Sequence, residues 1–322
     1  VHEFLKELVR DTGIEDMITV GEMSSTSLDN CIRYSNPEEK ELSMCFNFHH
    51  LKVDYKNGNK WELMDTDRKE LKRLFEEWQI GMQEHNGWNS LFWCNHDQPR
   101  IVSRMGNEGT YWKQSAKMLA AAVHLMRGTP YIYQGEEIGM PNAHFKDIND
   151  YRDVESLNYY EILLKEGKTK EEAIKTLQER SRDNSRTPMQ WSDEKNAGFS
   201  DVIPWISLPD HYKEINVENE LRDEDSIYYF YKKLIELRKE KEVIQEGTIE
   251  FFEKDDDDLL AYERNYKEEH LVVFNNLTEK EKEVEIPQLW TSYHKLIGNY
   301  DTENMKENKV VLRPYETLVL EK

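Results

Sequence analysis

The sequence has 322 residues, room for one large domain or two ordinary ones, and 38% of them are hydrophobic, so the chain can bury a sizeable core. Its net charge of −21 argues against nucleic-acid binding, because a phosphate backbone requires a basic face. No apolar run approaches the ~20 residues of a membrane span, and the scattered cysteines (Cys31, Cys45 and Cys94) predict buried thiols in a reducing compartment.

Up to about residue 241, short apolar runs alternate with helical patterns. After a helix over residues 3–10, each run is nearly continuously apolar and ends in polar residues, as expected of parallel strands that are buried on both faces. Strands are therefore predicted over residues 18–20, 43–48, 91–94 and 131–133.

The helices of this part carry recognisable end signals. Asp67 with Glu70 predicts a capping box, and apolar residues at helical spacing follow as far as Met82. A further helix is expected over residues 111–127, since Gly128 and then Pro130 follow it.

Residues 136–223 are too long a connection for a plain loop, and they contain helical patterns of their own. One helix is expected over 154–165, and a second begins after Thr169, which forms a capping box with Glu172. A last helix is expected over 226–239.

From about residue 245 the apolar pattern changes to a period of two, which predicts an antiparallel β domain. The acidic run 255–258 is expected at a hairpin tip. Strands are predicted over residues 248–252, 259–264, 270–275, 282–286, 309–312 and 317–320.

The predicted fold class is α/β. Residues 1–243 would form the second half of a (β/α)8 barrel with an extended loop over 136–223, and residues 244–322 a small antiparallel domain. Active sites of such barrels lie at the carboxyl ends of the strands. A full barrel needs ~250 residues, and the four predicted units supply half of one.

Carboxylates stand at two of these predicted strand ends. Retaining glycoside hydrolysis needs two carboxyls ~5 Å apart, and Glu22 and Asp97 are candidates of the required type. Taken alone, each carboxylate is more simply a solvated or capping residue.

The residues around them carry a stronger signal. Val20-Gly21-Glu22-Met23 and residues 95–100 (NHDQPR) resemble two motifs of glycoside hydrolase family 13, the α-amylase family. The resemblance implies that Glu22 is the general acid/base, and that Asp97 and His96 bind sugar hydroxyls and stabilise the transition state.

Further motifs resemble the oligo-1,6-glucosidase subgroup of that family. Residues 128–137 (GTPYIYQGEE) match its eighth barrel strand, and residues 181–191 (SRDNSRTPMQW) match the signature that follows. The resemblance implies that Arg186 reaches into the active site, with Arg182 as a second candidate. A structural ion pair is the alternative for either arginine.

One segment resembles the trehalose-6-phosphate hydrolases within this subgroup, namely residues 46–55 (FNFHHLKVDY) with Lys60-Trp61. It implies a small sugar-phosphate substrate. A phosphate needs cations and N–H donors, and His49, His50, Lys52 and Lys60 would supply them on an otherwise acidic chain. The alternative is that one histidine packs under the loop and that the lysines are merely solvated.

The family's nucleophile, an Asp at the end of the fourth barrel strand, has no counterpart in these residues. We therefore expect a C-terminal portion of a longer protein that is inactive alone and associates with its missing half or with itself. The expected reaction of the whole is hydrolysis of α,α-trehalose 6-phosphate with retention, in the cytoplasm, without cofactor, metal, membrane or nucleic-acid partner. The alternatives are an oligo-1,6-glucosidase acting on neutral oligosaccharides and a non-catalytic glycosidase-like ancillary subunit.

Overall fold

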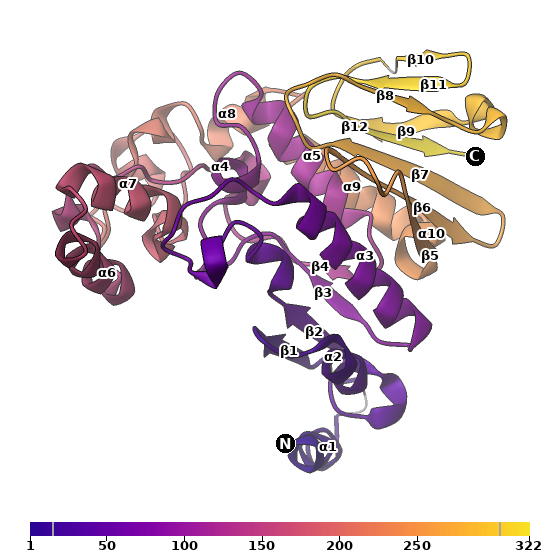
Figure 1. Cartoon of the computed structure of the whole chain (residues 1–322), viewed down its shortest axis with the longest axis horizontal. Coiled ribbons are helices and arrows are strands. Elements are labelled where there is room, and N and C mark those ends of the chain that lie inside the picture. Colours follow the sequence, from indigo (N-terminus) through magenta and orange to yellow (C-terminus); the bar gives the residue numbers. More distant parts are fainter. Residues whose placement is uncertain (15, 303) are drawn as a thin grey trace.

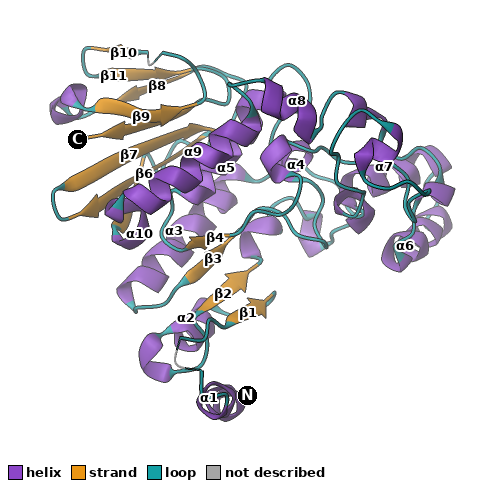
Figure 2. Cartoon of the chain, turned by 180° about the vertical axis from the view of Figure 1, so that it is seen from behind, coloured by secondary structure: helices purple, strands orange, loops and turns teal. Residues whose placement is uncertain are grey.

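The computed structural model describes residues 1–14, 16–302 and 304–322. A short parallel sheet lies at the centre of the chain, and its helices separate it from a C-terminal β region (Figure 1). Helices α6 and α7 form a lobe to one side, and the N-terminal helix lies at the far end, an arrangement also visible from behind (Figure 2). Among the helices of the described residues, none has both the length and the apolar composition of a membrane span.

The central sheet has four strands in the order β1-β2-β3-β4, and every pair in it is parallel. The predicted sequence of strands and its parallel sense are therefore confirmed. The strands are β1 (Val20–Met23), β2 (Met44–Asn47), β3 (Asn89–Leu91) and β4 (Thr129–Pro130).

The predicted bounds of β1, β3 and β4 are wrong by two or three residues. The apolar run after β3 continues through Phe92 and Trp93, which leave the sheet but stay buried. Trp93 donates its indole N–H to the carbonyl of Leu119, 2.7 Å away, in the helix behind the sheet. Phe92 and Trp93 therefore extend the apolar run beyond the end of the strand, because they are buried outside the sheet, Trp93 against a helix.

The four predicted helices of this part, α1, α3, α5 and α9, lie within a few residues of their predicted ends, whereas α2, α4 and α10 were not predicted, and one cap differs. Asp67 accepts from the N–H of Glu70, so the first half of the predicted capping box is present. The Glu70 carboxylate instead binds Arg73, at 2.6 Å. The helices are α1 (His2–Asp11), α2 (Leu28–Ser35), α3 (Arg68–Glu84), α4 (Ile101–Met105), α5 (Trp112–His124), α9 (Ile227–Glu240) and α10 (Glu242–Glu246).

Helix α5 joins the central sheet to the C-terminal β region. Met118 and its neighbours on α5 are fully buried, and the hydroxyl of Tyr262 in the β region donates to the carbonyl of Ala122, 3.0 Å away. Arg264 is also fully buried and donates to several backbone carbonyls, including that of Gly247 at 2.8 Å. Burial lowers the pKa of Arg264 to about 9. The two parts therefore share one continuous core.

Within residues 136–223, α6 and α7 form the lobe, with a small core that includes Tyr151, Leu163 and Leu177, whereas residues 217–222 pack against α9. The predicted helix over 154–165 is confirmed, as is the second capping box. The hydroxyl of Thr169 accepts from the N–H of Glu172 at 3.1 Å, and the Glu172 carboxylate accepts from the N–H of Thr169 at 2.8 Å. The helices are α6 (Val154–Lys165), α7 (Lys170–Arg180) and α8 (Val217–Arg222).

We expect Thr169→Ala to destabilise α7 by about 1 kcal/mol, because it leaves a helix-end N–H without its partner. The measurement is amide hydrogen exchange of α7 in the complete protein, where exchange should become faster. Thr169→Ser keeps the hydroxyl and should exchange like the wild type. Equal exchange in the Ala and Ser variants would contradict the prediction.

The C-terminal region contains a five-stranded and a three-stranded antiparallel sheet, packed around Phe274, Val284 and Leu312. All six predicted strands are present, and two further strands, β9 and β10, were not predicted. The strands are β5 (Thr248–Phe252), β6 (Leu259–Tyr266), β7 (Glu269–Asn276), β8 (Lys282–Glu285), β9 (His294–Gly298), β10 (Met305–Lys306), β11 (Lys309–Leu312) and β12 (Thr317–Glu321).

The acidic run 255–258 lies in the connection between β5 and β6, so the predicted hairpin is confirmed. Two of its carboxylates bind Lys282, Asp256 at 2.9 Å and Asp258 at 3.1 Å. Asp258 also binds Arg68 of α3, at 2.7 Å. The run thus ties the β region to the helix layer.

Candidate active site

A pocket of about 240 Å³ opens at the carboxyl ends of the central strands. Its walls are largely aromatic. The ring of Phe46 lies edge-on to Phe92 and Tyr131, with centroids 5.0 and 4.6 Å apart. A concave, mostly apolar site with few convergent polar groups is typical of small-ligand binding. Glu22, Asn95 and His96 contribute polar groups to it, so the structure brings the predicted site residues Glu22 and His96 together, while Asp97 is not among the lining residues.

Glu22 owes its place to the register of β1 and β2. The strand pairing sets Glu22 opposite Phe46, and the Glu22 side chain is exposed at the pocket. The preceding residue, Gly21, is buried, and a Cβ there would lie 2.6 Å from Leu42 and 2.7 Å from Met23. Glycine therefore permits the close packing that turns Glu22 outward.

Asp97 and His96 are held in the loop after β3 by Arg186. The guanidinium of Arg186 lies 2.5 Å from the Asp97 carboxylate, and its Nε donates to the carbonyl of His96 at 2.8 Å. Asn95 also accepts from the N–H of Asp97 at 2.8 Å. Arg186 thus meets both predicted sugar-binding residues, as a positioning group for the loop.

Arg182 extends this contact into a network of alternating charges. It lies 3.6 Å from Asp97, 2.6 Å from Asp153 and 3.3 Å from Glu155. Its hydrogen bond to Asp153 raises the pKa of Arg182. Glu155 in turn binds Lys60, at 3.0 Å. Lys60, Arg182 and the Asp97 loop therefore belong to one continuous set of ion pairs.

Two more of the predicted cationic residues lie beside the segment that follows β1. Lys52 donates to the carbonyl of Ser24 at 2.7 Å, and the Nε2 of His49 lies 3.0 Å from the carbonyl of Thr26. Lys52 is exposed and His49 is half-buried. Both therefore stand next to the strand that carries Glu22, where a ligand group outside the pocket could meet them.

His50 has a different environment, and its predicted role in phosphate binding needs correction. It is buried, and its Nε2 lies 2.9 Å from the carbonyl of Phe92. Burial lowers its pKa to about 4, so the ring is neutral near pH 7. Adjacent residues of the short 3-10 turn His49–Leu51 point to different sides, and His50 points into the core. We therefore leave His50 out of the candidate site.

Sequence reasoning missed the counter-ions of the network, Asp153 and Glu155. Both occupy the start of α6, as its N-cap and in its first turn, where acidic residues are ordinary. No local signal distinguishes them from simple helix caps.

All three cysteines are free and buried, as predicted. Within the described residues, no group of three or more His, Cys, Asp or Glu side chains could hold a metal ion.

Comparison with known proteins extends this picture. Residues 1–247 match the family described as "Alpha amylase, catalytic domain", and residues 259–319 match "Alpha-amylase SusG C-terminal domain". The trehalose-6-phosphate hydrolase of Bacillus subtilis (strain 168) is 50% identical over an alignment of 325 residues, gaps included, which covers 99% of this chain and 58% of that protein. The oligo-1,6-glucosidase of Bacillus cereus is 44% identical over 323 residues, or 99% of this chain and 58% of that protein.

The crystal structure of Bacillus licheniformis trehalose-6-phosphate hydrolase superposes with a TM-score of 0.96 at 54% identity, covering 99% of this chain and 59% of that one. The chain thus spans about 58% of the length of the curated relatives that it matches. Since the catalytic-domain family covers most of the chain, and the strand-end residues of the pocket carry its motifs, the chain belongs to the α-amylase family, glycoside hydrolase family 13.

Proposed function

We propose that the complete protein hydrolyses α,α-trehalose 6-phosphate to glucose and glucose 6-phosphate, with retention of configuration. The observation that carries the proposal is the placement of Glu22 and His96 in one aromatic-walled pocket, with cationic side chains beside it. The relatives named above point the same way. The expected substrate is a small sugar phosphate, and the expected location is the cytoplasm.

In this proposal β1 to β4 correspond to strands five to eight of a (β/α)8 barrel. Residues 1–243 would then be barrel and 244–322 the β domain. Glu22 protonates the leaving oxygen and then activates water, which is the double role of the acid/base in a retaining enzyme. Asp97 and His96 hold sugar hydroxyls as positive charge develops. The nucleophilic carboxylate comes from outside these 322 residues.

The phosphate would be recognised by His49, Lys52 and Lys60. Lys52 contacts a backbone carbonyl, that of Ser24, so two of its three ammonium N–H donors remain for a ligand. The ring of His49 stacks on Trp78, with centroids 5.1 Å apart, and its Nε2 faces the carbonyl of Thr26, so His49 offers a ligand its other ring nitrogen. Lys60 is mostly buried, and burial lowers its pKa while Glu155 opposes that shift. A cationic group of limited exposure suits a dianion, because little water must be displaced from it.

The second candidate function is oligo-1,6-glucosidase activity on neutral sugars. It is favoured by the 44% identity to such enzymes and by the ion pairs that already neutralise Lys60 and Arg182. A non-catalytic subunit is a weaker alternative, since Glu22, His96 and Asp97 are all in place at the strand ends.

A glucose-release assay on the complete protein separates these functions. Trehalose 6-phosphate, trehalose and isomaltose are compared at equal concentration, and we expect strong preference for the phosphorylated sugar. The double variant His49→Ala/Lys52→Ala should lower kcat/KM for trehalose 6-phosphate about 10²-fold and that for trehalose little, because each charge-assisted hydrogen bond contributes about 1.5–3 kcal/mol.

Lys56→Ala is the matched control, because Lys56 is an exposed lysine of the same loop. It should leave all three substrates unchanged. Best cleavage of isomaltose, with no effect of the phosphate group, would favour the neutral-sugar function. Glucose release from none of the substrates would favour the non-catalytic reading.

A further inference from the structure

Lys60 and Arg182 share one carboxylate oxygen. The Oε2 atom of Glu155 lies 3.0 Å from the Nζ of Lys60 and 3.3 Å from the Nε of Arg182. The Lys60 side chain is 17% exposed and the Glu155 side chain 37% exposed. A single acidic group, reachable from solvent, therefore bridges two cations at the edge of the candidate site.

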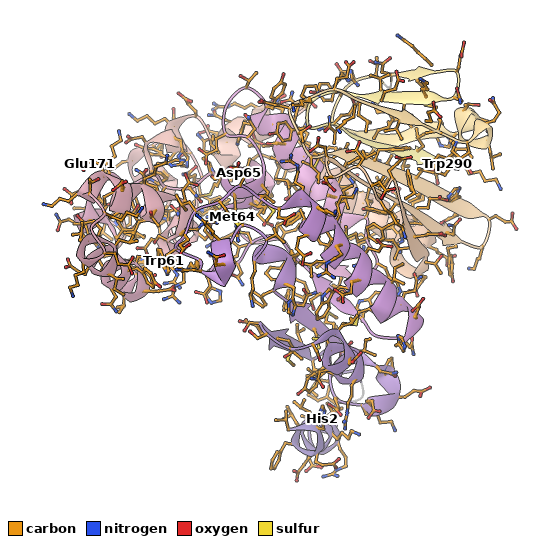
Figure 3. The ribbon with its side chains drawn as sticks, viewed as in Figure 1. His2, Trp61, Met64, Asp65, Glu171 and Trp290 are labelled. Atoms are coloured by element: carbon orange, nitrogen blue, oxygen red, sulfur yellow. The ribbon has the colours of Figure 1, made fainter. Side chains whose placement is uncertain are left out.

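The contact is fixed by packing around Lys60. The next residue, Trp61, is buried and stacks on Tyr159 of α6, with ring centroids 4.5 Å apart. The Nζ of Lys60 also lies 4.9 Å from the centre of the Trp61 ring. Figure 3 shows Trp61 where the loop meets the α6–α7 lobe. The stacked rings bring Lys60 to the start of α6, where Glu155 stands.

The two cations depend on Glu155 to different extents. Arg182 has two other partners, Asp153, whose carboxylate is 3% exposed and lies 2.6 Å away, and Asp97 at 3.6 Å. Among the described residues, Glu155 is the only carboxylate within ion-pair distance of Lys60. The charged groups that face Lys60 are thus Glu155, Arg182 and Asp153. If Glu155 withdraws, Lys60 loses its carboxylate partner while Arg182 keeps two.

A phosphate dianion and the Glu155 carboxylate would compete for the same N–H donors of Lys60. An ammonium group has three N–H donors, and a charge-assisted bond to either anion is strong. Two anions within about 6 Å of each other repel in a site of reduced polarity. Phosphate binding at Lys60 must therefore displace Glu155 or work against its charge.

We propose that Glu155 is a specificity-determining residue that acts as an internal counter-ion, holding Lys60 and Arg182 until a sugar phosphate takes its place. The inference rests on the proposed function, because it assumes that Lys60 receives a phosphate. A neutral sugar leaves the ion pairs of Glu155 with Lys60 and Arg182 intact. A phosphorylated sugar replaces the Glu155 carboxylate with its own phosphate group. Glu155 thus weakens phosphate binding and keeps the cationic site neutral when it is empty.

The test is calorimetric binding of glucose 6-phosphate to the complete protein, together with the KM for neutral trehalose. For Glu155→Gln we expect a Kd about three- to tenfold lower than in the wild type, and a KM for neutral trehalose that is unchanged. Glu161→Gln is the matched control, since Glu161 is an exposed carboxylate of the same helix. It removes the same charge and should leave the Kd unchanged.

Two further readouts exclude a merely structural effect. In the Lys60→Gln background, Glu155→Gln should give no gain in affinity, because the competition is for Lys60. The gain should also shrink as the pH rises, since the Glu155 charge raises the pKa of Lys60 and its loss lets Lys60 deprotonate at lower pH.

An unchanged or higher Kd in Glu155→Gln would overturn the inference, as would an equal gain in Glu161→Gln. If these results came with a wild-type preference for trehalose 6-phosphate, the proposed function would stand and only the role of Glu155 would fall. Failure of the wild type to bind glucose 6-phosphate or to prefer trehalose 6-phosphate would remove both.

Discussion

Replacing Glu22 with Gln in the complete protein should lower kcat/KM for trehalose 6-phosphate by about 10²- to 10⁴-fold, which is the usual contribution of a general acid/base. Glu22 is the ionisable side chain of β1 that reaches the pocket, and Gln preserves its size while removing its proton. A sugar leaving group is a poor one and needs that proton. The chemical step, and not binding, should therefore carry the loss, so that kcat falls while KM changes little.

An activated substrate distinguishes acid/base catalysis from a structural role. The leaving group of 4-nitrophenyl α-glucoside departs without protonation, so its first step should survive in Glu22→Gln. The second step still needs a base, so a burst of nitrophenol followed by slow turnover is expected. Added azide, which needs no base, should restore turnover.

Glu38→Gln serves as the control, because Glu38 is an exposed carboxylate in the turn before β2. It should behave as the wild type does. Equal losses on both substrates, without a burst and without rescue by azide, would show that Glu22 is not the acid/base.

The sequence predicted the order and type of most elements, because buried runs and helix caps are local signals. It predicted strand ends less well where burial continued beyond the sheet, as at Trp93. The chemical candidates Glu22, His96 and Asp97 could be identified from the motifs around them, because a carboxylate near a strand end is weak evidence when taken alone. The structure then places Glu22 and His96 in one pocket at the carboxyl ends of the strands, with Asp97 next to His96 in the loop after β3.

Side-chain direction and distant partners were beyond local signals. His49 and His50 are adjacent, yet one lies beside β1 and the other is buried in the core. Lys60 and its partner Glu155 are 95 residues apart in the sequence. Such a pair depends on the packing of Trp61 against α6, which only the fold reveals. The family resemblance pointed to Lys60 and Arg182, whereas their carboxylate partners, Glu155 and Asp153, could be identified only from the structure.

The position of Lys60 depends further on a buried ion-pair cluster formed by Asp54, Arg104 and Arg180. The Nε of Arg104 lies 2.7 Å from the Asp54 carboxylate, and Arg180 binds the same carboxylate from the end of α7. The three side chains are 2–5% exposed. The ring of Tyr55 also lies against both guanidinium groups. Asp54 thus fastens the loop that carries Lys60 to both α4 and α7.

Asp54→Asn should therefore destabilise the complete protein by about 3–5 kcal/mol, because it leaves buried guanidinium groups without their counter-ion. The measurement is urea unfolding at pH 7. Asp65→Asn is the control, since Asp65 is an exposed residue of the same connection, visible in Figure 3. It should change the free energy of unfolding by less than about 0.5 kcal/mol.

The pH dependence gives a sharper test of the same cluster. Burial acts to raise the pKa of Asp54, but the hydrogen bonds and charges of Arg104 and Arg180 outweigh it, so the pKa lies below its usual value. The unfolded chain, with a carboxyl pKa of about 3.9, binds the proton first as the pH falls. The contribution of Asp54 is therefore complete above about pH 4 and is lost as the pH falls through the folded pKa. The wild type and Asp54→Asn should converge in stability under acid, whereas a difference that stayed constant would mean that the carboxylate charge is not what holds the loop.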